Sequence, residues 1–202
     1  MSATATNVDP STVAAVTYTA LFVGVLVGAI VPIVPTGALV SAAAAAAAYS
    51  KYPETVLLVV LVASIAALIG DMALFAICSS RAGHRVLAWL RRRTSPALLD
   101  KSHRQLEEHG IRVLIVSRLI PAGRIPVMAA ALLSGLSWRW YLAGDSIACV
   151  AWSVTYAAIG ILSSTLFDEP WKGVVAAIGL VILVSLAPPV FKFLRNKVHA
   201  EK

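Results

Sequence analysis

Long apolar stretches separated by short polar segments make up most of the chain. Residues 55–79, 141–163 and 171–194 are apolar apart from isolated polar positions. Each is long enough to cross a bilayer as a helix, which takes about 20 residues. Two further apolar regions, 13–50 and 111–136, are interrupted by clusters of proline and glycine. The pattern predicts an all-α protein in which transmembrane helices accompany two broken helical segments.

The polar segment 80–110 separates the first half of the chain from the second. Its apolar positions recur at helical spacing, which predicts one or two amphipathic helices on the membrane surface. With position 112 it carries eight of the 17 basic residues: Arg81, Arg85, Arg91, Arg92, Arg93, Lys101, Arg104 and Arg112. The C-terminal tail is basic too. Because cytoplasmic loops are enriched in Lys and Arg, we expect both segments to be cytoplasmic and the acidic turn 163–172 to lie outside.

Region 111–136 follows a cytoplasmic segment, and the helix after it must start from the cytoplasmic side to reach the acidic turn. The region therefore has to begin and end on the same face of the membrane. Its two arms of about ten residues would each extend about 15 Å, half of a bilayer. We predict a re-entrant hairpin whose break contains Pro121, Gly123 and Pro126.

Region 13–50 contains a comparable break between Pro32 and Pro35. Two alternatives stay open for it. Residues 13–31 cross the membrane outward, or residues 21–49 form the whole hairpin with the preceding residues at the interface. Both alternatives give two broken segments that enter from opposite faces. This is the sequence pattern of an inverted-repeat transporter, whose site lies where the broken helices meet.

Composition supports a membrane environment. The 202-residue chain is 59% hydrophobic and 13% charged, with a mean hydropathy of +0.83, whereas soluble domains are about 45–50% apolar and about 25% charged. We therefore predict a multi-pass protein of the cell membrane. The net charge of +7 lies mainly in the cytoplasmic segments and does not indicate nucleic-acid binding. The polar N-terminus 1–12 lacks the basic residues of a signal peptide, so the first apolar segment is expected to be retained.

The cysteines and histidines give no sign of a metal or redox site. Cys78 and Cys149 lie in apolar runs without a pairing pattern, so they are predicted to be small packed side chains. The four histidines, at positions 84, 103, 109 and 199, lack metal-ligand spacing. We therefore expect no catalytic residue, metal or cofactor.

Arg118 and Arg124 flank the predicted tip of the second hairpin. A lone arginine at the bilayer centre costs about 2.5–3.5 kcal/mol, so two unpaired ones would offset much of a typical protein's stability. In one interpretation both side chains reach back to the cytoplasmic interface. The tip, however, is the deepest part of the hairpin. A guanidinium pair suits a phosphate because planar forks bind its oxygens bidentately, so we predict that both arginines bind an anionic phosphate.

Asp71 and Asp145 are the natural counter-charges, and each follows a glycine. Asp71 lies well inside region 55–79. Asp145 is near the start of its helix, where an interfacial acid is the alternative interpretation. A buried carboxyl group is either paired with arginine or protonated. Either arrangement permits coupling to protons, for which Asp71 is the preferred carrier.

Taken in order, these motifs resemble those of the DedA family (the VTT or SNARE-associated domain family) over about residues 20–165. The most specific motif is the stretch from Arg118 to Pro126, which has the pattern R-x-x-P-x-x-R. The others are the proline-rich break at 32–37, Gly70-Asp71 with Phe75 and Arg81-Ala82-Gly83, Glu108-His109-Gly110, Ser134-Gly135 and Trp152.

The resemblance implies two opposed re-entrant hairpins and a role in translocating or scrambling phospholipids. Some bacterial members of the family return undecaprenyl phosphate to the cytoplasmic leaflet, using the proton motive force. The resemblance also implies that Arg118 and Arg124 match the family's essential arginine pair. Family members commonly carry acids just after the first proline pair, where this chain has Thr36 and Gly37. These two positions, with Gly123, are predicted to line the substrate site, but the proton-coupling role of the absent acids does not transfer.

The predicted function is therefore movement of a phosphate-bearing membrane lipid between leaflets, with undecaprenyl or another polyprenyl phosphate as the first choice. Proton coupling stays open. The alternatives are a phosphatidylethanolamine scramblase, a proton-coupled ion or drug antiporter acting through Asp71, and a lipid-phosphate enzyme. The enzyme is the weakest, because Ser117-Arg118 has no histidine placed to attack phosphorus.

A single membrane domain is expected. It would end in a transmembrane helix at 171–194 and a cytoplasmic tail at 195–202. The alanine-rich arm 42–48 allows close helix packing within or between chains, so a homo-oligomer also stays open.

Overall fold

The computed structural model of the chain describes most of residues 10–181. The described ranges are 10–31, 35–50, 52–80, 95–120, 123–133, 136–167, 171–176 and 178–181, with the single positions 85, 88, 92 and 169. Pro32, Pro121, the second half of the predicted helix 171–194 and the tail 195–202 lie outside these residues, as does much of the basic segment after residue 80.

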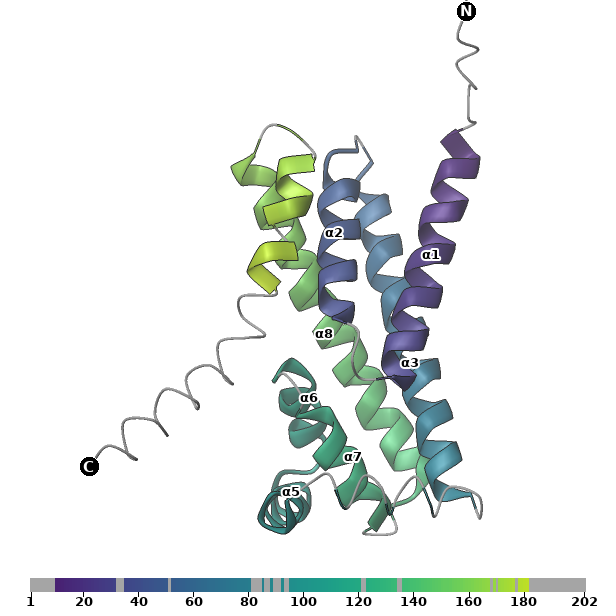
Figure 1. Ribbon diagram of the computed structural model, residues 1–202, viewed down its shortest axis with the longest axis vertical. Coiled ribbons are helices and arrows are strands. Elements are labelled where there is room, and N and C mark those ends of the chain that lie inside the picture. Colours follow the sequence, from purple (N-terminus) through teal and green to yellow (C-terminus); the bar gives the residue numbers. More distant parts are fainter. Residues whose placement is uncertain are drawn as a thin grey trace, which may run out of the picture.

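The described residues fold into helices, as the apolar pattern predicts. Their bounds are α1 Pro10–Ile30, α2 Thr36–Ala48, α3 Glu54–Ser79, α5 Pro96–His109, α6 Ile111–Leu119, α7 Arg124–Leu133 and α8 Trp138–Leu166. A further apolar helix covers Trp171–Val181. Within the described ranges, α3 and α8 are long and apolar enough to cross a membrane. They run along the long axis of the molecule, and the other helices lie beside them (Figure 1).

Both predicted breaks are present. The first lies between α1 and α2, and the second lies between α6 and α7. α6 and α7 have 9 and 10 residues, so each is about 15 Å long, the length expected for half a bilayer. In Figure 1 the α1–α2 pair occupies the upper part of the molecule and the α6–α7 pair the lower part. Whether each pair re-enters a membrane remains a prediction.

The first helix differs in length from its partner. α1 has 21 residues and runs unbroken from Pro10, whereas α2 has 13. Residues 11–20 therefore continue the same helix as residues 21–30. The two arms of the first pair are unequal, unlike those of the second.

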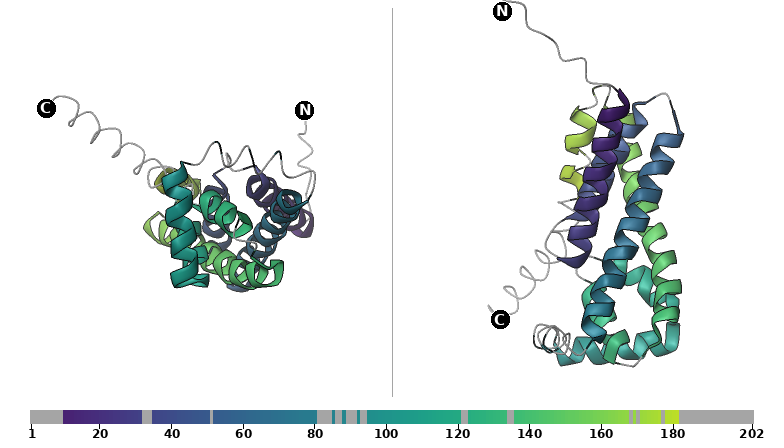
Figure 2. Two further views of the ribbon diagram at one scale, coloured as in Figure 1. Left: turned by 90° about the horizontal axis from the view of Figure 1, so that it is seen from below. Right: turned by 90° about the vertical axis from the view of Figure 1, so that its right-hand side faces the viewer.

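The α5 helix confirms part of the predicted amphipathic segment. It lies across the lower end of the molecule, roughly perpendicular to α3 and α8 (Figures 1 and 2). Leu106 and Ser102 are buried, while Arg104, Glu107 and Glu108 are exposed. The buried face packs beneath α6 and α7. This arrangement supports the second helix pair from below.

The alanine-rich α2 packs against α8 of the same molecule. Ala44 and Ala45 are fully buried, and the Ser41 hydroxyl donates to the carbonyl of Tyr156 on α8 at 2.7 Å. A Cβ on Gly160 would lie 2.2 Å from the Ser41 carbonyl oxygen, so the two backbones are as close as glycine permits. The small residues of this arm therefore contribute to packing within one molecule.

Two apolar clusters form the interior, one for each half. The upper cluster draws on residues 59–67 of α3, and the lower cluster on Phe75 and Cys78 of the same helix. Asp71 lies between these two stretches. On α3, the change from one apolar cluster to the other therefore occurs at the buried Asp71.

Candidate functional site

Arg118 and Arg124 lie on either side of the second break. Arg118 is one residue before the end of α6, and Arg124 is the first residue of α7. Their side chains are 6% and 19% exposed. Both side chains are therefore directed into the protein rather than toward its lower surface.

Asp71 pairs with both arginines. Nη1 of Arg118 donates to Oδ2 of Asp71, and Nη1 of Arg124 donates to Oδ1 of the same carboxyl group. Asp71 is fully buried, about 12 Å from the lower end of α3 at 1.5 Å per residue. A buried charge requires a partner, and here one carboxylate serves two guanidinium groups.

Asp145 completes the group from α8. Its Oδ1 accepts from Nη1 of Arg118 at 3.3 Å, and the Sγ of Cys149 lies 3.6 Å from its Oδ2. The side chain is 4% exposed, so it is a buried member of the site and not an interfacial acid. We call Arg118, Arg124, Asp71 and Asp145 the charge cluster.

Arg124 also joins the second break to the first. Its Nη2 donates to the carbonyl oxygen of Ala29 at 2.6 Å. Ala29 is in the last turn of α1, where carbonyls lack intrahelical donors and attract cations. The contact depends on close packing at Gly70, where a Cβ would lie 2.5 Å from the Ala29 Cβ. The glycine before Asp71 thus brings α1 against α3 at the level of the charge cluster.

An aromatic pair extends the site along α8. The guanidinium carbon of Arg118 lies 5.3 Å from the centre of the Trp152 ring, a cation–π distance. The Trp152 and Tyr156 rings are tilted with centroids 5.4 Å apart, and the Tyr156 ring lies over Gly37. Gly37, at the start of α2, is therefore linked to Arg118 through this aromatic pair.

One donor in the charge cluster is left without an acceptor. In the described part of the chain, Nε of Arg118 is the buried side-chain polar atom that has no hydrogen-bond partner. Buried polar groups in proteins are nearly always paired, and an unpaired donor costs about 1–3 kcal/mol. Nε and Nη2 form the side-on fork of an arginine, which binds two oxygens of one phosphate. The orphaned donor is therefore available to an acceptor oxygen.

The charge cluster suits an anion better than a cation. Oxygen or sulfur atoms of Asp71, Asp145 and Cys149 lie within 4.8 Å of one another. Such spacing alone would permit a cation, but both arginines contact Asp71 directly. A bound cation would be repelled by two guanidinium charges, and this repulsion between like charges is screened little in a buried site.

The other predicted site residues lie around the charge cluster without joining it. Gly123 has an ordinary backbone conformation, and its importance is space, because a Cβ would lie 2.6 Å from the Ser117 carbonyl oxygen. Pro35 immediately precedes α2, and Pro126 is in the first turn of α7, where a missing N–H leaves no helical bond unmade. Thr36 is half-buried at the start of α2.

Hydrolytic chemistry is not evident in the described residues. The Ser117 hydroxyl donates to the Leu114 carbonyl of its own helix at 2.9 Å. His103 and His109 belong to α5 and contact exposed glutamates of that helix. Neither imidazole is placed to activate Ser117 or to attack a phosphate held at the charge cluster.

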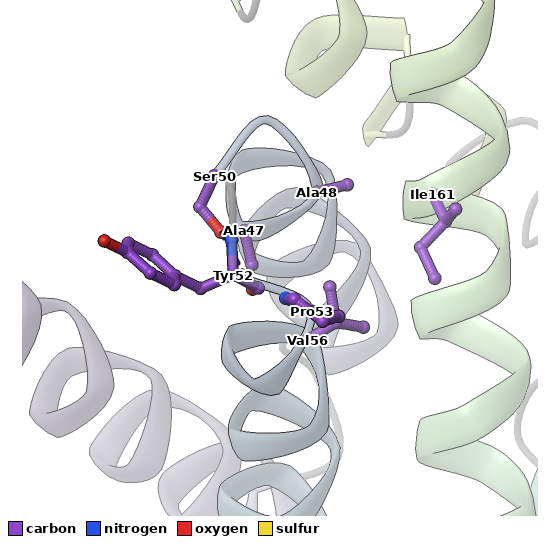
Figure 3. Close-up of a pocket in the computed structure, with 7 residues that line it drawn as sticks. All are labelled: Ala47, Ala48, Ser50, Tyr52, Pro53, Val56 and Ile161. Atoms are coloured by element: carbon purple, nitrogen blue, oxygen red, sulfur yellow. Dashed lines mark hydrogen bonds between the residues drawn. The ribbon is translucent and has the colours of Figure 1, made fainter.

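A pocket lies at the other end of the molecule. It has a volume of about 420 Å³ and is formed mainly by apolar side chains (Figure 3). The residues around it are Ala47, Ala48, Ser50, Tyr52, Pro53, Val56 and Ile161. Val56 is 15 positions before Asp71 on α3, about 22 Å along the helix. This pocket is therefore separate from the charge cluster, and none of the described residues around it is basic.

Sequence reasoning assigned no role in the site to three contributors. The Ala29 carbonyl has no side-chain signal, and only the fold brings it to Arg124. Cys149 is buried as predicted, but its thiol also contacts Asp145, one helical turn earlier on the same face. Trp152 is on that face as well, so the spacing 145, 149, 152 on α8 could have indicated both residues.

Comparison with known proteins agrees with the family resemblance of the sequence motifs. A model of the VTT domain matches residues 34–162, more than half of the chain. Protein DedA of Escherichia coli strain K12 is 25% identical over 134 residues, as is the protein of that name from E. coli O157:H7. The alignment covers 66% of this chain and 60% of each relative. No solved structure gives a significant match.

Proposed function

The chain belongs to the VTT-domain family of membrane proteins, as a DedA family member, and from this premise we propose that it moves a lipid with an anionic phosphate headgroup between leaflets. The observation that carries the proposal is the unpaired Nε of Arg118 within a charge cluster that is otherwise paired. A donor of this kind is suited to a ligand oxygen and has no evident structural use.

The headgroup would bind between the two arginines. Arg124 is the more accessible of the two, at 19% exposed, and its partners are one carboxylate and one backbone carbonyl. A phosphate can replace the carbonyl contact with a stronger charge-assisted one. Arg118, held by Asp71, Asp145 and Trp152, would then receive the phosphate at its unpaired Nε.

The lipid chain would stay outside the protein. The exposed faces of α3 and α8 carry large apolar side chains, among them Leu61, Ile65 and Ile69 on α3 and Val150 and Val154 on α8. Such faces favour contact with the hydrocarbon tail of a lipid. The protein would therefore recognise the phosphate and leave the chain in the bilayer. A polyprenyl phosphate is the first choice of substrate, and a phospholipid with a phosphodiester headgroup is the second.

Transbilayer movement in vesicles tests the proposal. We expect purified protein to move a fluorescent polyprenyl phosphate from the inner to the outer leaflet, where a quencher added outside can reach it. The chain-matched polyprenol, which lacks the phosphate, should stay in the inner leaflet. A parallel sample with labelled phosphatidylethanolamine separates a polyprenyl phosphate carrier from a general scramblase. Equal movement of phosphate and alcohol, or no movement of any phosphate lipid, would contradict the proposal.

A further inference from the structure

The two carboxyl groups of the charge cluster are held differently. Asp71 receives an arginine N–H on each oxygen, from helices on opposite sides of the second break. Asp145 receives one arginine N–H at 3.3 Å, from a nitrogen that Asp71 already engages, and among the described residues its other oxygen contacts the Cys149 thiol. A thiol is a weak donor. The structure thus contains one firmly paired carboxyl group and one loosely paired one.

The charge balance of the cluster changes when an anion binds. Two guanidinium and two carboxylate groups sum to zero, so the paired cluster is neutral without ligand. A phosphate monoanion would leave one uncompensated negative charge among side chains that are mostly less than a tenth exposed. Such a charge is strongly unfavourable in a buried site unless a proton or a counter-ion accompanies it.

We propose that Asp145 takes up one proton when the lipid phosphate binds, and that Asp71 remains ionised as the counter-ion of both arginines. The inference rests on the proposed function. Protonation of Asp71 would remove the partner of two guanidinium groups, whereas protonation of Asp145 gives up one long contact. It also relieves repulsion between two carboxylates whose oxygens lie within 4.8 Å. The sequence favours Asp71 as proton carrier, and the contacts of the two acids reverse that preference.

Charged groups from three other helices lie at or next to Asp145. The Asp71 carboxyl group on α3 lies within 4.8 Å of it, Arg118 on α6 donates to it, and Arg124 on α7 contacts Asp71. On α8 itself the neighbours are the Cys149 thiol and the Tyr141 phenol, both of which are buried. A phosphate placed against the arginines would reduce their effect on Asp145. Anion binding and proton uptake are therefore linked, and each favours the other.

The test is binding of a short-chain polyprenyl phosphate methyl ester, a permanent monoanion whose own charge does not change near neutral pH. For the wild-type protein in detergent we expect affinity to rise as pH falls, by up to about tenfold per pH unit where one proton is taken up. A weakly buffered solution with a pH indicator should report about one proton bound per ester, as this linkage requires.

Asp145→Asn should bind the ester without proton uptake and without pH dependence. Its affinity at high pH should exceed that of the wild-type protein, because the competing carboxylate is gone; a merely structural residue would weaken binding instead. Asp145→Glu should restore the proton uptake. Glu54→Gln, which changes an exposed acid at the start of α3, is the control and should behave as wild type.

The outcomes are distinguishable. Binding of the ester by the wild-type protein without proton uptake, or equal uptake by Asp145→Asn, overturns the inference and leaves the proposed function standing. If Asp145→Asn does not fold, the infrared difference spectrum of the wild-type protein decides, because the inference requires a new protonated-carboxyl band when the ester is added. Failure of the wild-type protein to bind the ester at any pH contradicts the proposed function, and the inference falls with it.

Discussion

Replacement of Arg118 by alanine is expected to abolish movement of lipid phosphate. The side chain supplies the unpaired Nε and contacts both acids of the charge cluster as well as Trp152. Loss of one partner of a buried, hydrogen-bonded charge pair costs about 2–5 kcal/mol. A loss of about 3 kcal/mol in binding corresponds to a reduction of roughly 100-fold.

The alanine variant also leaves Asp71 with one partner fewer, so stability has to be measured beside transport. Arg118→Lys keeps the positive charge but lacks the planar fork, and we expect it to fold and to transport poorly. Arg112→Ala, which changes an exposed arginine on the same helix, should retain both stability and transport. Transport by Arg118→Lys at the rate of Arg112→Ala would show that a point charge suffices and that the fork has no role.

Asp71→Asn is expected to destabilise the fold more than any other isosteric change in the charge cluster. The variant removes the carboxylate that contacts both arginines and leaves Asp145 to compensate them alone. Breaking a buried ion pair from one side costs about 3–5 kcal/mol. Unfolding of the purified protein in one detergent should therefore show a marked loss of stability for this variant.

Two matched variants serve as comparisons for the stability loss of Asp71→Asn. Asp145→Asn loses only the longer contact of 3.3 Å, so its loss of stability should be clearly smaller. Glu54→Gln, in the exposed first turn of the same helix as Asp71, should lie within about 0.5 kcal/mol of wild type. Equal losses for Asp71→Asn and Asp145→Asn would contradict the division of roles between the two acids.

Periodicity and topology predict much of this architecture from sequence. The apolar runs 55–79 and 141–163 are the long helices α3 and α8, because continuous hydrophobicity of that length leaves few alternatives. The breaks at the proline and glycine clusters are predicted just as directly, since proline ends helices for local steric reasons. The energetic cost of a charge in an apolar run identifies Arg118, Arg124 and Asp71 as candidate site residues, because such a charge requires compensation.

The relations between distant residues could not be predicted in this way. From the sequence, Asp145 could equally be an interfacial acid or a buried member of the site, because its position is close to a helix end. Only the packing of α6 against α8 distinguishes the two. The Ala29 carbonyl and the aromatic pair of Trp152 and Tyr156 enter the site through tertiary packing alone. Sequence does not reveal which acid engages both arginines, since this depends on the direction of side chains from four helices.

Contact between an arginine side chain and the phosphate of a lipid is the central claim, and solid-state NMR measures it directly. The protein carries ¹⁵N-labelled arginine in phosphate-free glycolipid vesicles with added polyprenyl phosphate, so that every ³¹P signal comes from the ligand. We predict ¹⁵N–³¹P dipolar dephasing of guanidinium signals in the wild-type protein and its loss when Arg118 and Arg124 are both replaced by lysine. Absence of dephasing in the wild-type protein at saturating lipid phosphate, or dephasing that persists unchanged in the double variant, would contradict the claim.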